Sequence, residues 1–179
     1  MDETPSTADR IREVALDLFL DRGYVGASMR EIAGEVGVST PALYYHFGSK
    51  DDLLAAIVEG LAADGESLLR HLAEVRRSEG FAELALGAYF DLLISHLEVF
   101  RFVSTDRAVR SHPVAGHRLA RQADTFHSLL SGPRPSRSMT IRAAAAIGAI
   151  RRPLRLPSID RARDRRLVIR AALAALGAR

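Results

Sequence analysis

Apolar residues recur at helical spacing along almost the whole chain of 179 residues, and the alternation typical of β-strands is nearly absent. The first segment shows this clearly, because five apolar residues fall on one stripe of a helix: Ile11, Val14, Ala15, Leu18 and Phe19. The same spacing returns in later segments up to the end of the chain. We therefore expect an all-α fold of about nine helices, forming one domain or two small ones that share a core.

Capping signals divide the first fifty residues into short helices. Gly23 follows the first stripe at the place of a left-handed residue that ends a helix. The sequence SMRE from Ser28 has the form of a capping box, and Gly37 ends the helix that it starts. Ser39 begins a third helix shortly afterwards, with Pro41 in its first turn.

Longer helices are expected in the rest of the chain. A fourth helix runs from Lys50 to about Arg77, and Gly65 in its middle favours a bend. Residues 81–97 are apolar nearly all round, so this helix is expected to be buried on most sides. The remaining helices are expected at 99–109, 115–130, 138–152 and 158–178, with a loop at 132–137.

Composition excludes several classes of protein. No cysteine is present, which excludes disulfides, thiolate metal sites, iron–sulfur clusters and thiol nucleophiles. The first ten residues are acidic and polar, unlike a signal peptide, and the apolar runs are far too short to cross a bilayer. We expect a soluble, cytoplasmic protein that does not contact the membrane.

No motif of a catalytic or cofactor site occurs, since a nucleophile elbow, a phosphate-binding loop and a dinucleotide fingerprint are all absent. Four potential metal ligands between residues 112 and 127 raise the alternative of a metal site: His112, His117, Asp124 and His127. His112 and His117 lie on either side of Pro113 and would not share a helix face, and no Glu-x-x-His pair occurs. We expect no metal, no cofactor and no catalytic residues, and hence no enzyme.

Charge gives a mixed indication. The net charge of +3 and the isoelectric point near 9.8 favour nucleic acid as a partner. Residues 1–50, however, contain five basic and eight acidic side chains, whereas residues 51–179 contain twenty basic and fourteen acidic ones. The positive charge therefore lies outside the segment in which the strongest motif occurs.

That motif is the segment 28–47, SMREIAGEVGVSTPALYYHF. Two short helices with a glycine turn cannot form a core alone and must pack at a steep angle against a third, residues 7–22. The inward positions of the second short helix leave Tyr44, Tyr45 and His46 exposed. Hydroxyls and an imidazole on this surface suit contacts to DNA phosphates, whereas ordinary half-buried packing of the tyrosines is the alternative.

The stretch MREIAGEVGVSTPALYYHFGSKDDLL closely resembles the DNA-binding segment of the TetR family of transcriptional repressors. The likeness continues upstream through RIREVALDLFLDRGYVGAS and covers about residues 8–65, a third of the chain. The resemblance implies a TetR-type helix-turn-helix domain at 6–66, with the helix-turn-helix itself at about 28–47. It also implies a ligand-binding and dimerisation domain at 67–179.

Position by position, the resemblance implies two groups of DNA contacts. Ser28 and Arg30 at the start of the second helix, and Lys50 at the start of the fourth, would meet backbone phosphates. The third helix would enter the major groove with seven residues: Ser39, Thr40, Pro41, Ala42, Tyr44, Tyr45 and His46.

Direct reading of bases is expected to be sparse. Thr40 and Ala42 are short where Arg, Lys or Asn would make bidentate contacts, and Pro41 has no N–H. Contacts with thymine methyl groups and DNA shape are expected to contribute instead. For Arg30 the alternative is a solvated side chain without a role in DNA binding.

The resemblance further implies that the last two helices pair with those of a second copy in a four-helix bundle. The small side chains of AAAAIGAI, residues 143–150, permit close approach, and the final helix has little polar surface. The expected interface residues are Ala143, Ala146, Ile150, Ile169, Leu173 and Leu176. The alternative is that both helices only cover the core of their own chain.

The same domain is expected to hold a pocket for a small-molecule effector. Its candidate lining is mostly apolar and aromatic: Tyr89, Phe90, Leu93, His96, Phe100, Phe126, His127 and Ile147. His96 and His127 are expected to point inward and to orient the ligand. Ordinary core packing is the alternative for each aromatic residue.

These observations predict a ligand-responsive transcriptional regulator. We expect a repressor that binds double-stranded DNA at a palindromic operator as a homodimer and is released by a small hydrophobic effector. The alternative is a helical small-molecule-binding or interaction protein with a degenerate DNA-binding end, which the negative charge of residues 1–50 favours.

Overall fold

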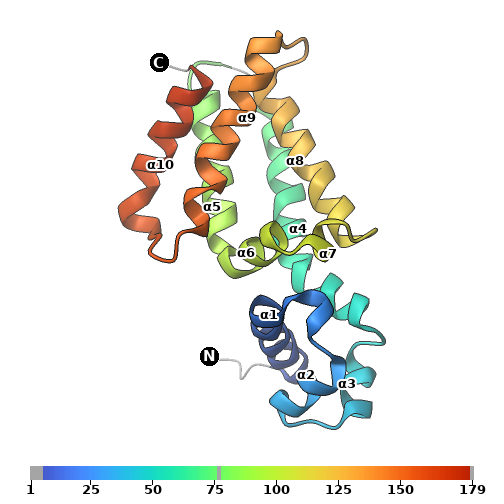
Figure 1. Cartoon of the computed structure of the whole chain (residues 1–179). Helices are drawn as coiled ribbons and strands as arrows, with labels where there is room; N and C mark the ends of the chain where they lie inside the picture. Colours follow the sequence, from blue (N-terminus) through green and yellow to red (C-terminus); the bar gives the residue numbers. More distant parts are fainter. Residues whose placement is uncertain (1–5, 76–77, 178–179) are drawn as a thin grey trace. The chain divides into compact units, whose positions relative to one another are not determined.

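The computed structural model describes residues 6–75 and 78–177, and within them the regular secondary structure is entirely helical (Figure 1). The all-α fold expected from the apolar spacing is confirmed. The elements are α1 (Thr7–Gly26), α2 (Met29–Val36), α3 (Thr40–His46), α4 (Lys50–Glu74), α5 (Phe81–Ser95), α6 (Leu97–Thr105), α7 (Arg107–Arg110), α8 (Ala115–Ser131), α9 (Arg137–Arg151), the 3-10 turn η1 (Pro153–Arg155) and α10 (Arg161–Leu176).

The helices form two compact units. The N-terminal unit consists of the described residues up to Gly60 together with Phe102–His117, and the C-terminal unit consists of Leu61–Arg101 and the described residues from Arg118 onward. Helix α4 contributes residues to both units. The expected boundary at residue 67 places 102–117 in the second domain, whereas this segment packs with α1 to α3 and the start of α4.

Helix α1 begins at a side-chain cap and is kinked near its end. The Asp9 backbone N–H donates to Ser6 Oγ (3.1 Å), and the Asp9 carboxylate accepts from the Ser6 N–H (3.1 Å), which closes a capping box. Gly23 has φ 74° and ψ 159°, so the regular helix breaks there and a short extension follows. Gly23 thus has the positive φ expected of a glycine that ends a helix, but its ψ lies outside the left-handed helical region.

The short helices α2 and α3 begin where the capping signals predict. The Glu31 N–H donates to Ser28 Oγ (3.2 Å), and Gly37 ends α2 with φ 81°. The Ala42 N–H donates to Ser39 Oγ (3.2 Å), with proline in the first turn of α3. A left-handed glycine and a serine cap therefore fix the two ends of the turn between these helices.

Buried apolar side chains of α1 to α4 form the core of the N-terminal unit: Ile11, Ala15, Phe19, Ile32, Leu43, Leu53 and Leu54. Phe102 of α6 joins this core and stacks on Phe19, with ring centroids 5.5 Å apart. Burial of one large apolar side chain favours folding by roughly 1.5–3 kcal/mol. The later segment is therefore part of what holds the first helices together.

The single helix expected at 99–109 is wrong, because the chain forms two helices there. Helix α6 ends at Thr105, and α7 occupies one turn from Arg107 to Arg110. Asp106 lies between them with an extended backbone, and its side chain accepts the Val109 N–H (3.0 Å) as the cap of α7. An aspartate binds backbone N–H groups in this way and therefore favours caps over helix interiors.

Helix α4 is continuous from Lys50 to Glu74, and its expected end near Arg77 lies outside the described residues. Gly65 provides space for a neighbour, since a Cβ there would lie 2.5 Å from Gln122 Oε1. The Gln122 amide donates to the Ala62 carbonyl (2.8 Å). This glycine thus permits α8 to approach α4 within the C-terminal unit.

Helix α5 is buried on most sides, as its apolar composition predicts. Helices α9 and α10 pack side by side and both contact α5 (Figure 1). Asp91 of α5 accepts two hydrogen bonds from the guanidinium of Arg165 on α10, at 2.9 and 2.7 Å. An aromatic pair, Tyr89 and Phe126, stacks with ring centroids 4.2 Å apart.

Five of the six residues expected at the dimer interface lie instead in the core of their own chain. Ala143, Ala146 and Ile150 of α9 have no exposed surface. On α10, Ile169 and Leu176 are buried and Leu173 is half-buried. A side chain without exposed surface cannot contact a partner chain. For these residues of α9, the alternative that the helix covers the core of its own chain is therefore the correct one.

Small or apolar residues also occur among the exposed positions of α9 and α10, beside exposed arginines. On α9 the exposed residues of this kind are Ile141, Ala144, Ala145 and Gly148, and on α10 they are Leu167, Ala171 and Ala174. The side chains of Ile141 and Leu167 are 59% and 60% exposed. Because AAAAIGAI is small or apolar all round, its spacing did not indicate which side faces inward.

Among the helices of the described ranges, none combines the length and the apolar composition that a bilayer crossing requires. Within the same ranges no group of three or more histidines and acids is placed to hold a metal ion.

Candidate nucleic-acid interface

The helix-turn-helix is built on an apolar inner side. Ile32 and Val36 of α2 are buried, as are Leu43 of α3 and Phe47 directly after it. These four residues hold the two short helices against each other and against α1. Burial of Leu43 and Phe47 agrees with the expectation that the inward positions of this helix leave Tyr44, Tyr45 and His46 exposed.

The outer side of α3 carries aromatic polar groups. Tyr45 is 88% exposed, Tyr44 is 47% exposed, and His46 is exposed. The Tyr45 and His46 rings meet edge to face with centroids 5.7 Å apart. These large side chains are not packed into the core, so their hydroxyl and imidazole groups are available to a ligand outside the unit.

The start of α3 presents little chemistry for reading bases. Pro41 is exposed, Thr40 and Ala42 are half-buried, and the Ser39 hydroxyl is used as the cap of the helix. The helix therefore offers one short hydroxyl and apolar atoms at its leading end. This arrangement agrees with sparse direct readout.

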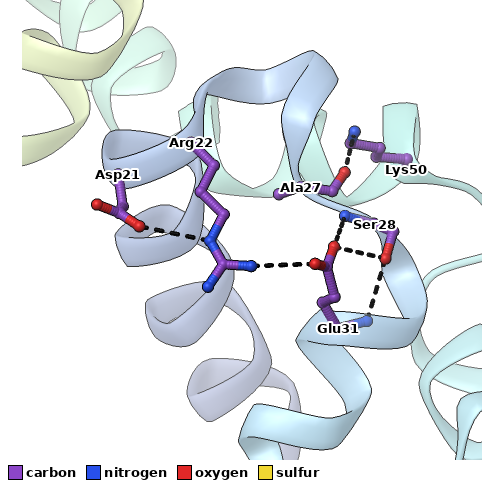
Figure 2. Close-up of polar contacts among 6 residues, drawn as sticks. All are labelled: Asp21, Arg22, Ala27, Ser28, Glu31 and Lys50. Carbon is purple, nitrogen blue, oxygen red and sulfur yellow. Dashed lines mark hydrogen bonds and ion pairs between the residues drawn. The ribbon is translucent and has the colours of Figure 1, made fainter.

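The start of α2 is held by a compact polar network, which Figure 2 shows. The Glu31 carboxylate accepts from the Ser28 N–H (2.8 Å), the Ser28 hydroxyl (2.7 Å) and Arg22 Nη1 (3.0 Å). The bonds from Ser28, followed by the charge of Arg22, hold the pKa of Glu31 below its usual value. The carboxylate is thus compensated by its neighbours, and exposed Arg30 lies on the same helix.

Lys50 is half-buried and turned toward the protein. Its ammonium donates to the Ala27 carbonyl (Figure 2) and lies 4.5 Å from the centroid of the Tyr24 ring. Burial lowers the pKa of Lys50, while the carboxylates of Asp106, Asp51 and Glu31 act in the opposite direction. The predicted phosphate anchor therefore has an internal partner directly before the start of α2.

Sequence reasoning missed a cluster behind this network. The Tyr24 hydroxyl donates to the Asp51 carboxylate, and burial, followed by this bond, raises the pKa of Tyr24. His112 lies beside both, with its Nε2 3.4 Å from Asp51 Oδ1, while its Nδ1 accepts from the Ala115 N–H (3.2 Å). Asp106 completes the cluster. No spacing signal joins residues 24, 51, 106 and 112.

The family model for bacterial regulatory proteins of the tetR family matches residues 11–57, which covers α1 to α3 and the start of α4. This segment of the chain belongs to the TetR family.

Curated relatives agree with this assignment. The chain is 34% identical over 105 residues to the HTH-type transcriptional activator FasR of Mycolicibacterium smegmatis, covering 56% of this chain and 47% of FasR. It is 29% identical over 115 residues to the HTH-type transcriptional repressor AcnR of Corynebacterium glutamicum, covering 62% of this chain and 57% of AcnR. The chain thus spans about half the length of the curated relatives it matches.

Solved TetR-like structures share the fold over nearly the whole chain. The ketosteroid transcriptional regulator KstR2 of Mycobacterium tuberculosis has a TM-score of 0.75 at 17% identity, covering 98% of this chain and 95% of KstR2. The transcriptional regulator FadR of Bacillus subtilis, in complex with stearoyl-CoA, has a TM-score of 0.62 at 15% identity, covering 93% and 97%. The family is one of regulatory proteins, so the expectation that this chain is not an enzyme is confirmed.

Within this TetR-family fold, most residues predicted to line the effector pocket are buried together in the C-terminal unit. They are Tyr89, Phe90, Leu93, Phe100 and Phe126, with Ile147 half-buried. The guanidinium of Arg151 lies 5.7 Å from the centroid of the Phe100 ring. These positions fit either a packed core or the wall of a pocket.

The two histidines of the predicted pocket have other partners. His96 Nε2 donates to the Asp64 carboxylate (2.8 Å), and His127 Nε2 donates to the Thr140 carbonyl (3.0 Å). His127 lines an open groove of about 730 Å³ between the end of α8 and the start of α9. The expectation that both histidines point into one inner pocket is therefore wrong, because each bonds to a neighbouring helix.

Proposed function

We propose that this TetR-family protein is a DNA-binding transcriptional regulator that reads double-stranded DNA with α3. The exposed Tyr44, Tyr45 and His46 on a folded helix-turn-helix carry this proposal. The Ser28, Glu31 and Arg22 network supports it, since the start of α2 is fixed and its nearest acid is compensated.

In this proposal the DNA contacts comprise a phosphate-binding set and a groove-binding set. Exposed Arg30 and the start of α2 would meet backbone phosphates, while α3 enters the major groove with the residues from Ser39 to His46. Because the leading end of α3 is short and apolar, DNA shape would contribute much of the sequence preference.

The protein would act as a homodimer on a palindromic operator. The exposed small and apolar residues of α9 and α10, rather than the buried Ala146 and Ile150, would form the partner surface. A two-fold dimer presents two identical recognition helices, so its half-sites should be inverted repeats one helical turn or a multiple apart.

A small, mostly apolar effector would bind the C-terminal unit and release the DNA. The aromatic cluster around Tyr89 and Phe126 supports this class of ligand, as does the stearoyl-CoA bound to FadR. Helix α4 has residues in both units, so an effector that favours one position of α4 would change the affinity for DNA. Couplings of this kind are typically ~1–3 kcal/mol. AcnR, a repressor, supports repression as the outcome.

Selection from a random duplex library with the full-length protein tests DNA binding. We expect an inverted repeat to be enriched, and Tyr45→Phe to weaken binding to it by ~1 kcal/mol without a change in melting temperature, since this ring is outside the core. Enrichment of no sequence at any salt concentration would contradict the proposal.

The negative charge of residues 1–50 favours a second candidate, a helical small-molecule-binding protein whose DNA-binding end is degenerate. The two candidates differ in one measurement. The degenerate protein would be stabilised by apolar compounds in a thermal-shift screen but would enrich no duplex. The regulator would be stabilised by such compounds and would also enrich a duplex.

A further inference from the structure

The kink of α1 gives one backbone N–H a partner far along the chain. At Gly23 the regular helix breaks, and the N–H of the next residue, Tyr24, donates to Asp106 Oδ2 at 2.7 Å. The two residues are 82 positions apart in the sequence. A Cβ on Gly23 would lie 3.3 Å from the same oxygen, so the glycine also makes room for this carboxylate.

Asp106 serves two helices at once. Its Oδ1 accepts the Val109 N–H (3.0 Å) and caps α7, while its Oδ2 accepts from Tyr24 at the end of α1. A hydrogen bond to a charged acceptor is roughly twice as strong as one between neutral groups. One carboxylate side chain therefore joins α1 to α7 within the N-terminal unit.

Tyr24 and Lys50 continue this connection to the helix-turn-helix. The Lys50 ammonium lies over the Tyr24 ring and donates to the Ala27 carbonyl. Ala27 directly precedes Ser28, whose hydroxyl and N–H form the capping box of α2. Each step is a contact between neighbours, so the carboxylate of Asp106 and the start of α2 belong to one polar network.

We propose that Asp106 is a positioning residue for DNA binding. It fixes the end of α1 through the Tyr24 N–H, and through Tyr24 and Lys50 it sets the place of Ala27 and the start of α2. The segment 102–117 is then a functional part of the DNA-binding unit, although the family model covers only residues 11–57. This inference rests on the proposed DNA-binding function.

The competing explanation is that Asp106 only caps α7. Asp106→Ser separates the two roles, because a serine hydroxyl can accept the Val109 N–H but is too short to reach Tyr24. Asp160→Ser is a matched control, since Asp160 caps α10 in the same way through the Arg163 N–H (2.7 Å) and belongs to the C-terminal unit. Asp106→Asn is a second variant of nearly unchanged size.

Affinity is measured with full-length proteins and a fluorescent duplex carrying the sequence that the wild type selects from a random library. We expect Asp106→Ser to weaken binding about tenfold, with a slope of affinity against salt equal to that of the wild type, because no phosphate contact is lost. Asp160→Ser should bind within twofold of the wild type. A tenfold loss with a salt slope reduced by about one would overturn positioning in favour of direct contact.

Amide hydrogen exchange provides a second readout that does not depend on DNA. In Asp106→Ser the Tyr24 amide should exchange faster while the Val109 amide keeps its protection. Wild-type affinity in both Asp106 variants, or unchanged exchange at Tyr24, would overturn the inference. If Asp106→Ser does not fold, the same comparisons are made with Asp106→Asn, in which one oxygen cannot serve both N–H groups. A wild type that selects no duplex would refute the proposed function instead.

Discussion

The first three helices and the last two helices of this chain all begin at side-chain caps, but they differ in how clearly the sequence indicates their buried side. In α1 to α3, each start has a serine cap, and glycines with positive φ break α1 and end α2, so these boundaries are set within a few residues. In α9 and α10, small and apolar residues lie on both the buried and the exposed sides. Local polar groups fix where a helix begins, whereas only packing decides which side of a uniformly apolar helix is buried.

The strongest test of this comparison uses two adjacent alanines of α9. Ala146 has no exposed surface, so Ala146→Arg would bury a charge in the core and lower the free energy of unfolding by more than about 4 kcal/mol. Ala145 is exposed, so Ala145→Arg should keep the fold and disrupt the proposed dimer. Circular dichroism melting and light scattering check both. A folded Ala146→Arg with the melting temperature of the wild type would contradict the burial of this side.

Glycines of the N-terminal unit provide the second test, because replacing two of them with alanine should change the free energy of unfolding in opposite directions. Gly23→Ala should destabilise by roughly 1–2 kcal/mol, since φ is positive there and the Asp106 carboxylate is close. Gly34 lies inside α2 with no atom within 4 Å of an added Cβ, so Gly34→Ala should stabilise by up to about 1 kcal/mol. Urea denaturation measures both, and equal signs would show that backbone conformation is not the deciding factor.

Arg30 and Lys50 provide a third test, which separates outward from inward cations of the N-terminal unit. Arg30→Gln should lower the slope of log affinity against log salt by about one, because an exposed guanidinium would lose a phosphate contact. Lys50→Met should weaken binding with little change in slope, because its ammonium is bonded to Ala27. A slope reduced by one in Lys50→Met would instead support the phosphate contact that the family resemblance implies for Lys50.

The smallest expected effect concerns the ion pair of the C-terminal unit. The bonds from Arg165 lower the pKa of Asp91, so the pair stabilises the fold above the ordinary carboxyl pKa and the stabilisation is lost as the pH falls through the lowered value. Because the pair is partly exposed, Asp91→Asn should cost only about 0.5–1 kcal/mol at pH 7. The cost should vanish at a pH below the lowered pKa of Asp91 and shrink in concentrated salt. A cost that is independent of pH would point to packing rather than charge.

The sequence by itself determined the helical class, the starts of α1 to α4 and the outward side of α3. Each of these depends on groups within about four residues of one another, such as the Ser28–Glu31 box, or on a stripe that is apolar on one side only. The same signals failed at Asp106, where a residue that suits a cap divided an expected helix.

Tertiary structure alone decided the partners of Asp106 and Lys50 and the buried side of α9. It also decided that His96 and His127 form hydrogen bonds with other helices. The bond from Tyr24 to Asp106 spans 82 residues, and no local spacing encodes a contact at that distance. In α9, alanine and isoleucine occur on every side, so burial is set by the helices that pack against it. Local chemistry therefore determined where the helices lie in the sequence, and contacts between distant segments determined which side chains are buried and which partners they bind.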